Sequence, residues 1–380
     1  MAARLGSFVL LLLSFAISGE VGSFLYLRYI AGVDWRPAYL MQGPAHGRGW
    51  LTEREPWGAW HWPNDTGTQE GRCFSVALRS NFFGARDRER TIGGDAHRTI
   101  VLGDSFAEGW GIEEDERLSN LLEARYDREF LNFGIENDTG PLQYQLIYER
   151  LASRFSHDQV VIMFLPDNDF TDNDAEYWRR FRADFPERYR PYYQVADDGY
   201  RPFYPVPKPA DNVADPRGVP QLGWPAWAAN TIRRNSWSAA TYRYLGLQSH
   251  SGGVYSGYVD FTADQLRAVL WSFARIKALA GEREVTILVI PRLKDFLRVA
   301  SSGDHRLIEA LDRFGQEHNV KVFDLLQWMP KVEPRTEQYY LPCNGHWSAT
   351  GNRVAADALG MATRYSPLSH AADGVGQTAR

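Results

Sequence analysis

The sequence is poor in cysteine: its 380 residues include two, Cys73 and Cys343, and no Cys-x-x-Cys motif. A structural zinc site built on thiolates is therefore not expected. An excess of positive charge is missing too, since 42 Lys and Arg stand against 47 Asp and Glu, for a formal net charge of −5. We therefore expect no nucleic-acid partner, because nucleic acid is bound through a concentrated positive field.

A calcium loop and a cofactor are not expected either. The acidic run DNDFTDND at 167–174 lacks the glycine and the distal glutamate of an EF-hand loop. Cys343 and His346 are spaced like half of a metal site, but the other cysteine lies 270 positions away. We therefore expect no bound metal and no cofactor.

Long apolar runs are absent except at the N-terminus. From Leu5 to Leu27 there is one charged residue, Glu20, and about 20 apolar residues suffice to cross a bilayer. The alternative is a cleaved signal peptide with a small-residue site near 16–18; a buried core helix suits the extreme N-terminus poorly. Segment 1–30 is thus predicted to be an anchor or a signal, with Arg4 inside and the rest outside the cytoplasm.

The two cysteines are predicted to form a disulfide. The chain is expected in an oxidising compartment, where cysteines pair, and it offers only Cys73 and Cys343. The bond would tie an early segment of the chain to the turn that carries His346.

Aromatic residues are plentiful, at 14% of the chain with 13 Trp. This composition suits a surface that faces carbohydrate or glycolipid, although a large core with aromatic loops would give the same figure. Residues 31–97 combine Trp, Pro, Gly and charge, and we interpret them as a loop-rich lead-in with a short strand or two near CFSVAL. The polar tail, 363–380, is predicted to be disordered.

The middle of the chain alternates between strand and helix patterns. Short apolar runs predict strands at 98–103, 129–134, 158–166, 284–290 and 320–326, and helical spacing predicts helices at 115–126, 141–155, 262–282, 306–318 and 348–362. Such alternation predicts a three-layer α/β/α domain over 98–362, with a five-stranded parallel sheet covered on both faces. Ligands of such folds bind beyond the carboxyl ends of the strands.

A polar and aromatic stretch, 170–261, interrupts this alternation. We interpret it as a lid-like insert over the strand ends, with one or two helices between about 225 and 246. A solvated, decorative insert is the alternative.

The stretch VLGDSFAEGWGI, 101–112, places Asp104 and Ser105 at the end of the first predicted strand. A serine on such a turn can present its hydroxyl outward with backbone N–H groups beside it, as a nucleophile requires. The alternative is a Ser or Asp that caps a helix.

Four such stretches together resemble the SGNH (GDSL-type) hydrolases. GDSF resembles the first block of that family, and NFGIENDTG, 132–140, resembles the second, with Asn137 where the family has glycine. LPDNDF, 165–170, resembles the third, and NGHWSATG, 344–351, resembles the fifth. The resemblance implies a flavodoxin-like fold, Ser105 as nucleophile and His346 as general base. It also implies an oxyanion hole made by the Ser105 N–H, the backbone near Asn137 and the Asn168 amide.

The resemblance further implies an ester hydrolase acting outside the cytoplasm. The segment SNFFGARD resembles membrane-anchored bacterial members, which implies a single-pass location in the inner membrane. An O-acylated glycan or glycolipid is the expected substrate. Two alternatives remain open: an O-acetyltransferase of polysaccharide assembly, and a catalytically weak glycan-binding module.

The acid of a Ser-His-Asp triad is missing. It usually stands three positions before the histidine, and Cys343 occupies that position. Asn344 or a backbone carbonyl is therefore expected to orient the His346 ring. The site is expected to work, with a lower turnover rate than a full triad gives. Asp324, at the end of the fifth predicted strand, is the alternative acid, although a residue there can equally be a strand-end cap.

Overall fold

The computed structural model describes residues 2–30, 51–94, 97–181, 188–197, 199–209, 224–249, 255–332, 335–363 and 365. The predicted tail beyond residue 365 and the first part of the predicted lead-in, 31–50, lie outside the described residues.

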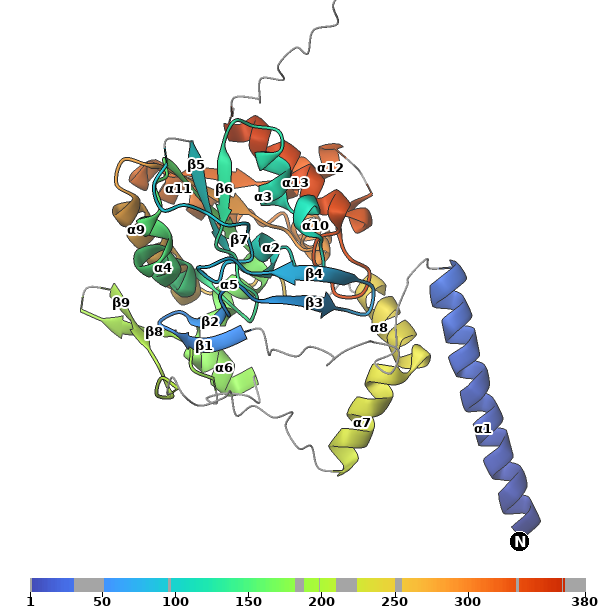
Figure 1. Ribbon diagram of the computed structural model, residues 1–380. Helices are drawn as coiled ribbons and strands as arrows, with labels where there is room; N and C mark the ends of the chain where they lie inside the picture. Colours follow the sequence, from blue (N-terminus) through green and yellow to red (C-terminus); the bar gives the residue numbers. More distant parts are fainter. Residues whose placement is uncertain are drawn as a thin grey trace, which may run out of the picture.

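A five-stranded parallel sheet forms the centre of the molecule (Figure 1). Its order is β11-β10-β7-β5-β6, with β5 Arg98–Gly103, β6 Glu129–Asn132, β7 Gln159–Phe164, β10 Glu284–Val289 and β11 Lys321–Asp324. β5 and β7 are buried along their whole length, as their nearly continuous apolar sequences require.

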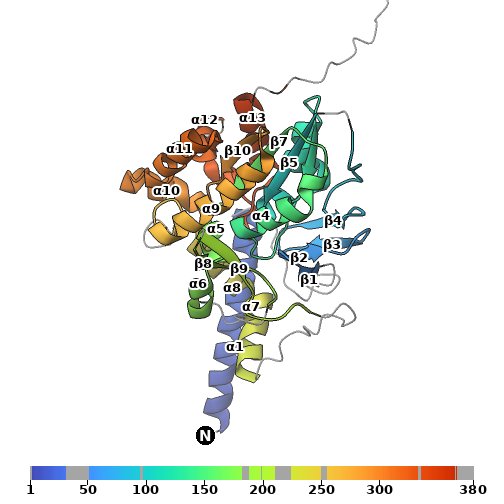
Figure 2. The same ribbon diagram turned by 90° about the vertical axis from the view of Figure 1, so that its left-hand side faces the viewer.

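Two hydrophobic cores, one on each face of the sheet, make up the three layers. In β5, Ile100 and Leu102 point into one core and Val101 into the other, because successive side chains of a strand point to opposite faces. The first core is covered by α4 Pro141–Arg150, α9 Ala263–Ala280 and α11 Arg306–His318, and the second by α3 Leu118–Glu123, α12 Leu325–Val332 and α13 Ala349–Thr363. Figure 2 views the molecule from the side of α4 and α9.

The strand order places the carboxyl ends of β5 and β7 side by side. From β5 the chain moves outward to β6, and then returns across β5 to form β7. This reversal is the switch point at which flavodoxin-like folds bind their ligands. The predicted fold class is therefore confirmed, and the loops after β5 and β7 are expected to carry the site.

The lead-in forms two antiparallel hairpins instead of mostly loop. They consist of β1 Leu51–Glu55, β2 Gly58–His61, β3 Thr66–Glu70 and β4 Ser75–Arg79. β4 coincides with the strand expected near CFSVAL, whereas β1 and β2 lie in the Trp-rich part that was expected to be loop.

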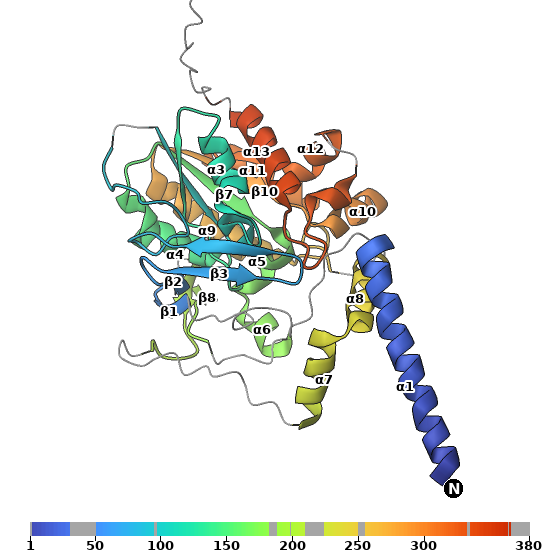
Figure 3. The same ribbon diagram turned by 45° about the vertical axis from the view of Figure 1, so that its right-hand side comes forward.

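The insert contributes helices and a hairpin that lie outside the central sheet. Its elements are α6 Ala175–Phe181, β8 Tyr192–Ala196, β9 Gly199–Phe203, α7 Trp224–Asn235 and α8 Trp237–Ser249, and it follows α5 Pro166–Asp172. The hairpin lies on α9, where Tyr193 Oη and Ser272 Oγ are 2.8 Å apart. Helix α8 instead packs along α1 Ala2–Leu25, which points away from the sheet (Figure 3).

Candidate active site

Ser105 stands at the turn between β5 and the short helix α2 Ser105–Glu108. Asp104 caps this helix, since its Oδ1 accepts a hydrogen bond from Phe106 N at 2.8 Å. As the first residue of α2, Ser105 has a backbone N–H with no acceptor within the helix. Both alternatives drawn from the sequence thus apply, to different residues: Asp104 is the cap and Ser105 presents its hydroxyl.

His346 meets this hydroxyl from the other end of the chain. Its Nε2 lies 2.8 Å from Ser105 Oγ. The turn before α13 carries His346 and is closed by a 2.6 Å bond from Leu341 N to the His346 carbonyl. Gly345 in this turn has a φ of 73°, a conformation in which a side chain would be strained. A hydroxyl and an imidazole nitrogen at this separation form the basic unit of a nucleophile and its base.

Neither Asn344 nor Asp324 contacts His346 Nδ1, the imidazole nitrogen that does not face Ser105. Asn344 Oδ1 accepts from the backbone N–H of His346 at 3.1 Å, a two-residue turn that asparagine commonly forms. Asp324 Oδ1 is engaged by Tyr258 Oη at 2.9 Å and by Leu326 N at 3.0 Å. Within the described residues, His346 Nδ1 is buried and has no hydrogen-bond partner.

Aromatic packing holds the imidazole instead. The ring centroid of His346 lies 5.0 Å from that of Phe106 and 5.8 Å from that of Trp110, both at tilted angles. Burial lowers the pKa of His346 well below its usual value of 6.5, and the nearby Arg292 guanidinium lowers it further. The ring is therefore neutral at physiological pH, which is the state that a general base requires.

Asn168, at the start of α5, lines the same pocket but is already engaged. Its Nδ2 donates to Asp172 Oδ2 at 2.8 Å and to Asp104 Oδ2 at 3.3 Å. Burial raises the pKa of Asp104 to about 6. The longer of these two bonds, to Asp104, is the weaker one, so its N–H is the one more readily given up to an oxyanion.

Asn137 stands where the second block of the resembled family has glycine, and it adopts a φ of 93°. This conformation is rare for a residue with a side chain. Arg188, from the insert, holds it by donating to the Asn137 carbonyl at 2.9 Å and to Asp138 Oδ2 at 2.7 Å. Glu53, from the lead-in, pairs with the same arginine at 3.0 Å. Sequence reasoning missed this clamp because its members come from three distant segments.

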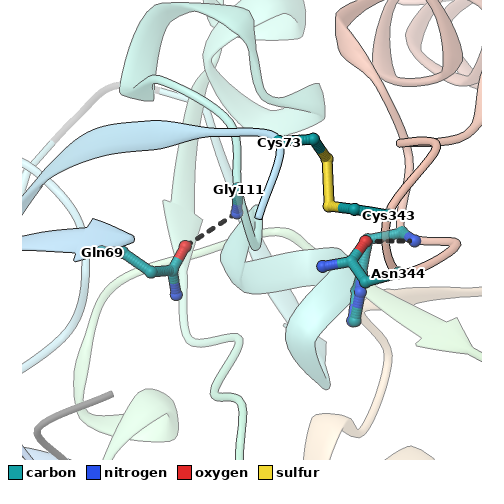
Figure 4. The surroundings of a disulfide bond; sticks show 6 residues. Gln69, Cys73, Gly111, Cys343 and Asn344 are labelled. Carbon is teal, nitrogen blue, oxygen red and sulfur yellow. Dashed lines mark hydrogen bonds between the residues drawn. A yellow bond between two sulfur atoms is a disulfide. The ribbon is translucent and has the colours of Figure 1, made fainter. Parts of the chain in front are cut away.

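Cys73 and Cys343 are joined by a disulfide, with an S–S distance of 2.07 Å (Figure 4). The bond connects the β3–β4 hairpin to the turn that carries His346. Beside it, Gln69 Oε1 accepts from Gly111 N at 2.7 Å, which ties the same hairpin to the loop after α2. The lead-in thus braces both halves of the site.

A buried arginine in SNFFGARD supports the end of α2 and the loop after it. Arg86 donates to the carbonyl oxygens of Gly109 at 2.5 Å, Ile112 at 2.6 Å and Glu108 at 3.2 Å. Burial lowers its pKa to about 10. Three carbonyl groups behind the nucleophile turn are thus fixed by one side chain, which gives this motif a structural role.

A cavity of about 480 Å³ opens over Ser105 and His346. Asn137, Asn168, Trp110 and Arg292 are among the residues that line it, and none of the described residues of the insert does. In the described part of the chain, no group of three His, Cys, Asp or Glu is arranged to hold a metal ion.

Comparisons with known proteins give a structural likeness only. No family model and no curated protein matches the chain. Among solved structures, a lipolytic G-D-S-L family protein from Veillonella parvula is 15% identical, covering 71% of this chain and 100% of its own, with a TM-score of 0.37. A lipase/acylhydrolase from Enterococcus faecalis is 12% identical over 71% and 98%, with a TM-score of 0.36. The acetylxylan esterase Axe2 from Geobacillus stearothermophilus, solved as a catalytic mutant, is 11% identical over 73% and 98%, with a TM-score of 0.38. At these scores the likeness assigns no activity to this chain.

Proposed function

We propose that this chain is a serine-dependent ester hydrolase of the SGNH type that uses a Ser105–His346 dyad. The 2.8 Å contact between Ser105 Oγ and His346 Nε2, at the floor of an open cavity, carries the proposal. Four sequence blocks that resemble this family support it, because they converge on the cavity from distant parts of the chain.

In the proposed reaction, Ser105 Oγ attacks the acyl carbon while His346 Nε2 takes the hydroxyl proton. The oxyanion accepts hydrogen bonds from the Ser105 N–H, the backbone at Asn137 and one N–H of Asn168. Each such donor is worth about 3 to 4 kcal/mol of barrier. His346 then returns the proton to the leaving alcohol oxygen, and water releases the acyl group by the same steps in reverse.

The dyad works without an acid on the second imidazole nitrogen. Phe106 and Trp110 fix the plane of the ring, which an acid would otherwise help to do. Nothing negative among the described contacts of the His346 ring offsets the imidazolium that forms during transfer. Turnover is therefore expected to be slower than that of a full triad, in which replacing the acid with its amide costs about 10⁴ in kcat, chiefly by favouring the wrong imidazole tautomer.

The substrate is proposed to be an O-acyl ester on an envelope glycan or glycolipid. A cavity that is open to solvent and carries Trp110, amide groups and charged groups suits a saccharide better than a long acyl chain. Because the same polar lining does not favour a long acyl chain, we propose a short acyl group such as acetyl.

The N-terminal helix is proposed to be a retained anchor rather than a cleaved signal. Residues 6–30 are long and apolar enough to cross a bilayer. Glu20 accepts from Ser236 Oγ at 2.6 Å and from the N–H of Trp237 at 2.7 Å, at the start of α8. A carboxylate costs about 2.5 to 3.5 kcal/mol at the centre of a membrane helix, and these donors offset that cost. Cleavage of the segment would strip α8 of its cap, which supports retention at the inner membrane.

The direct test is hydrolysis of p-nitrophenyl acetate by the full-length chain in detergent micelles. Wild type should turn over, and Ser105→Ala and His346→Ala should fall to the background rate. A wild-type rate in Ser105→Ala would contradict the proposal. Product analysis with and without a glycan acceptor separates hydrolysis from acetyl transfer, and absence of turnover in wild type would favour a binding module.

A further inference from the structure

A cation, and not an acid, is the charged group that acts on the proposed base, since Arg292 lowers the pKa of His346. Arg292 lies just beyond the carboxyl end of β10 and lines the cavity. Its backbone N–H donates to Asp295 Oδ2 at 2.7 Å, at the start of α10 Leu293–Ser302. Its guanidinium lies 5.6 Å from the ring centroid of Phe106, the ring that packs on His346.

The guanidinium is weakly engaged within the protein. Among the described residues, its one carboxylate contact is with Asp167 Oδ2 at 3.8 Å, and Asp167 also pairs with Lys294 at a shorter separation. Its bond to the Asn344 carbonyl, at 3.5 Å, is at the limit of a hydrogen bond. The Arg292 side chain is 24% exposed. A guanidinium has five N–H donors, and Arg292 lines the cavity, so donors remain for a group bound there.

This position is unfavourable for acyl transfer from a neutral ester. His346 must become an imidazolium when it takes the proton from Ser105, and the charge of Arg292 opposes that step. A negative group bound to Arg292 would remove the opposition, because it would neutralise the cation that disfavours the imidazolium.

We propose that Arg292 binds the carboxylate of an O-acylated acidic saccharide, and that this carboxylate supplies the negative charge that the dyad lacks. The inference rests on the proposed function and names its substrate class. A guanidinium matches a carboxylate with two parallel hydrogen bonds. The cavity lining carries two arginines, Arg72 and Arg292, against Glu136 and Asp138. This balance favours a single negative charge over a phosphate dianion.

In the proposed reaction the substrate carboxylate makes and breaks no bond. The ester is cleaved as described for the dyad, and the carboxylate stays ionised on Arg292 throughout. It therefore acts on both binding and the chemical step. A role for Arg292 that is confined to supporting the turn at Asn344 would alter the rate on every ester alike, and selectivity separates the two roles.

The test compares two mono-O-acetylated methyl glycosides, one of glucuronic acid and one of glucose, which differ only in the C6 carboxylate. Full-length chain in detergent micelles should prefer the glucuronoside by about tenfold or more in kcat/KM, since a charge-assisted hydrogen bond is stronger than a neutral one. Part of the preference should appear in kcat. Arg292→Gln should bring the ratio close to one, and Arg292→Lys should give an intermediate value.

The matched control is Arg267→Gln, which removes an arginine from the exposed face of α9 and should retain the wild-type ratio. Hydrolysis of p-nitrophenyl acetate together with no preference between the glycosides would overturn this inference and leave the proposed function standing. A preference that persists in Arg292→Gln would overturn it too, as would a stronger preference for a 6-phosphate glycoside. No hydrolysis of any ester by wild type would overturn both proposals.

Discussion

Replacing both cysteines with serine tests how firmly the lead-in holds the turn that carries His346. The disulfide joins positions 270 residues apart. In the chain-entropy model, closing a loop of this length lowers the entropy of the unfolded chain by an amount worth about 5.6 kcal/mol at 25 °C. The Gln69–Gly111 hydrogen bond remains in the variant, so the hairpin keeps one attachment to the site.

We therefore expect the Cys73→Ser/Cys343→Ser variant to lose about 3 to 5 kcal/mol in the free energy of unfolding. Urea titration of the full-length chain in detergent micelles, followed by tryptophan fluorescence, measures the change. The kcat/KM on p-nitrophenyl acetate should fall as well, because the His346 turn loses its tether.

Cys73→Ser alone is the matched control for this experiment. It removes the same bond and should match the double variant in stability. A loss below about 1 kcal/mol in the free energy of unfolding would refute the reasoning, because the chain-entropy model assigns several kcal/mol of stabilisation to a loop of this length. Two free thiols in denatured, non-reduced wild type would refute the bond itself.

Four further outcomes are expected. Asn344→Asp should change kcat/KM less than tenfold, far below the roughly 10⁴ effect of a triad acid. The reason is that the new carboxylate would stay on the backbone N–H of His346, and a hundredfold gain would instead place it on the imidazole ring. Asp324→Asn should retain kcat/KM within about threefold, since Asp324 bonds Tyr258 and Leu326 N, whereas collapse would make Asp324 the acid. The acid limb of the kcat/KM profile should lie well below pH 6.5, because the lowered pKa keeps His346 neutral there; a limb at or above 6.5 would contradict the burial argument. A periplasm-active reporter fused after residue 60 should be active, and a cytoplasm-only reporter active there would contradict the topology.

The central sheet could be predicted from the sequence, because each strand is a short apolar run between breaks in helical spacing. The boundaries were less certain where apolar residues continue. Leu325 and Leu326 were predicted to end the fifth strand, but they begin α12. Neither α10 nor α12 was expected, since a short apolar segment has no period long enough to distinguish a buried strand from a helix.

Some of the residues that line the site, Ser105, Asn137, Asn168 and His346 among them, could also be found from the sequence, but their contacts could not. Ser105 Oγ and His346 Nε2 lie 2.8 Å apart, and the catalytic roles given to them stay predictions. The Asn344 side chain accepts a hydrogen bond from the backbone N–H of His346 instead of from the ring. Asparagine readily forms such local bonds with the backbone two residues on. Arg188 and Arg292 carry no motif of their own, and only the fold brings Arg188 onto the Asn137 carbonyl and Arg292 into the cavity lining. The described part of the insert packs on α9 and α1, which no local pattern encodes.

Covalent labelling of the nucleophile tests the central claim most directly. Full-length chain should be treated with a fluorophosphonate, digested and analysed by mass spectrometry. The account predicts one adduct, on Ser105 in the GDSF peptide, that is lost in Ser105→Ala and formed far more slowly in His346→Ala. Absence of an adduct on Ser105, or the same labelling rate in His346→Ala as in wild type, would contradict it.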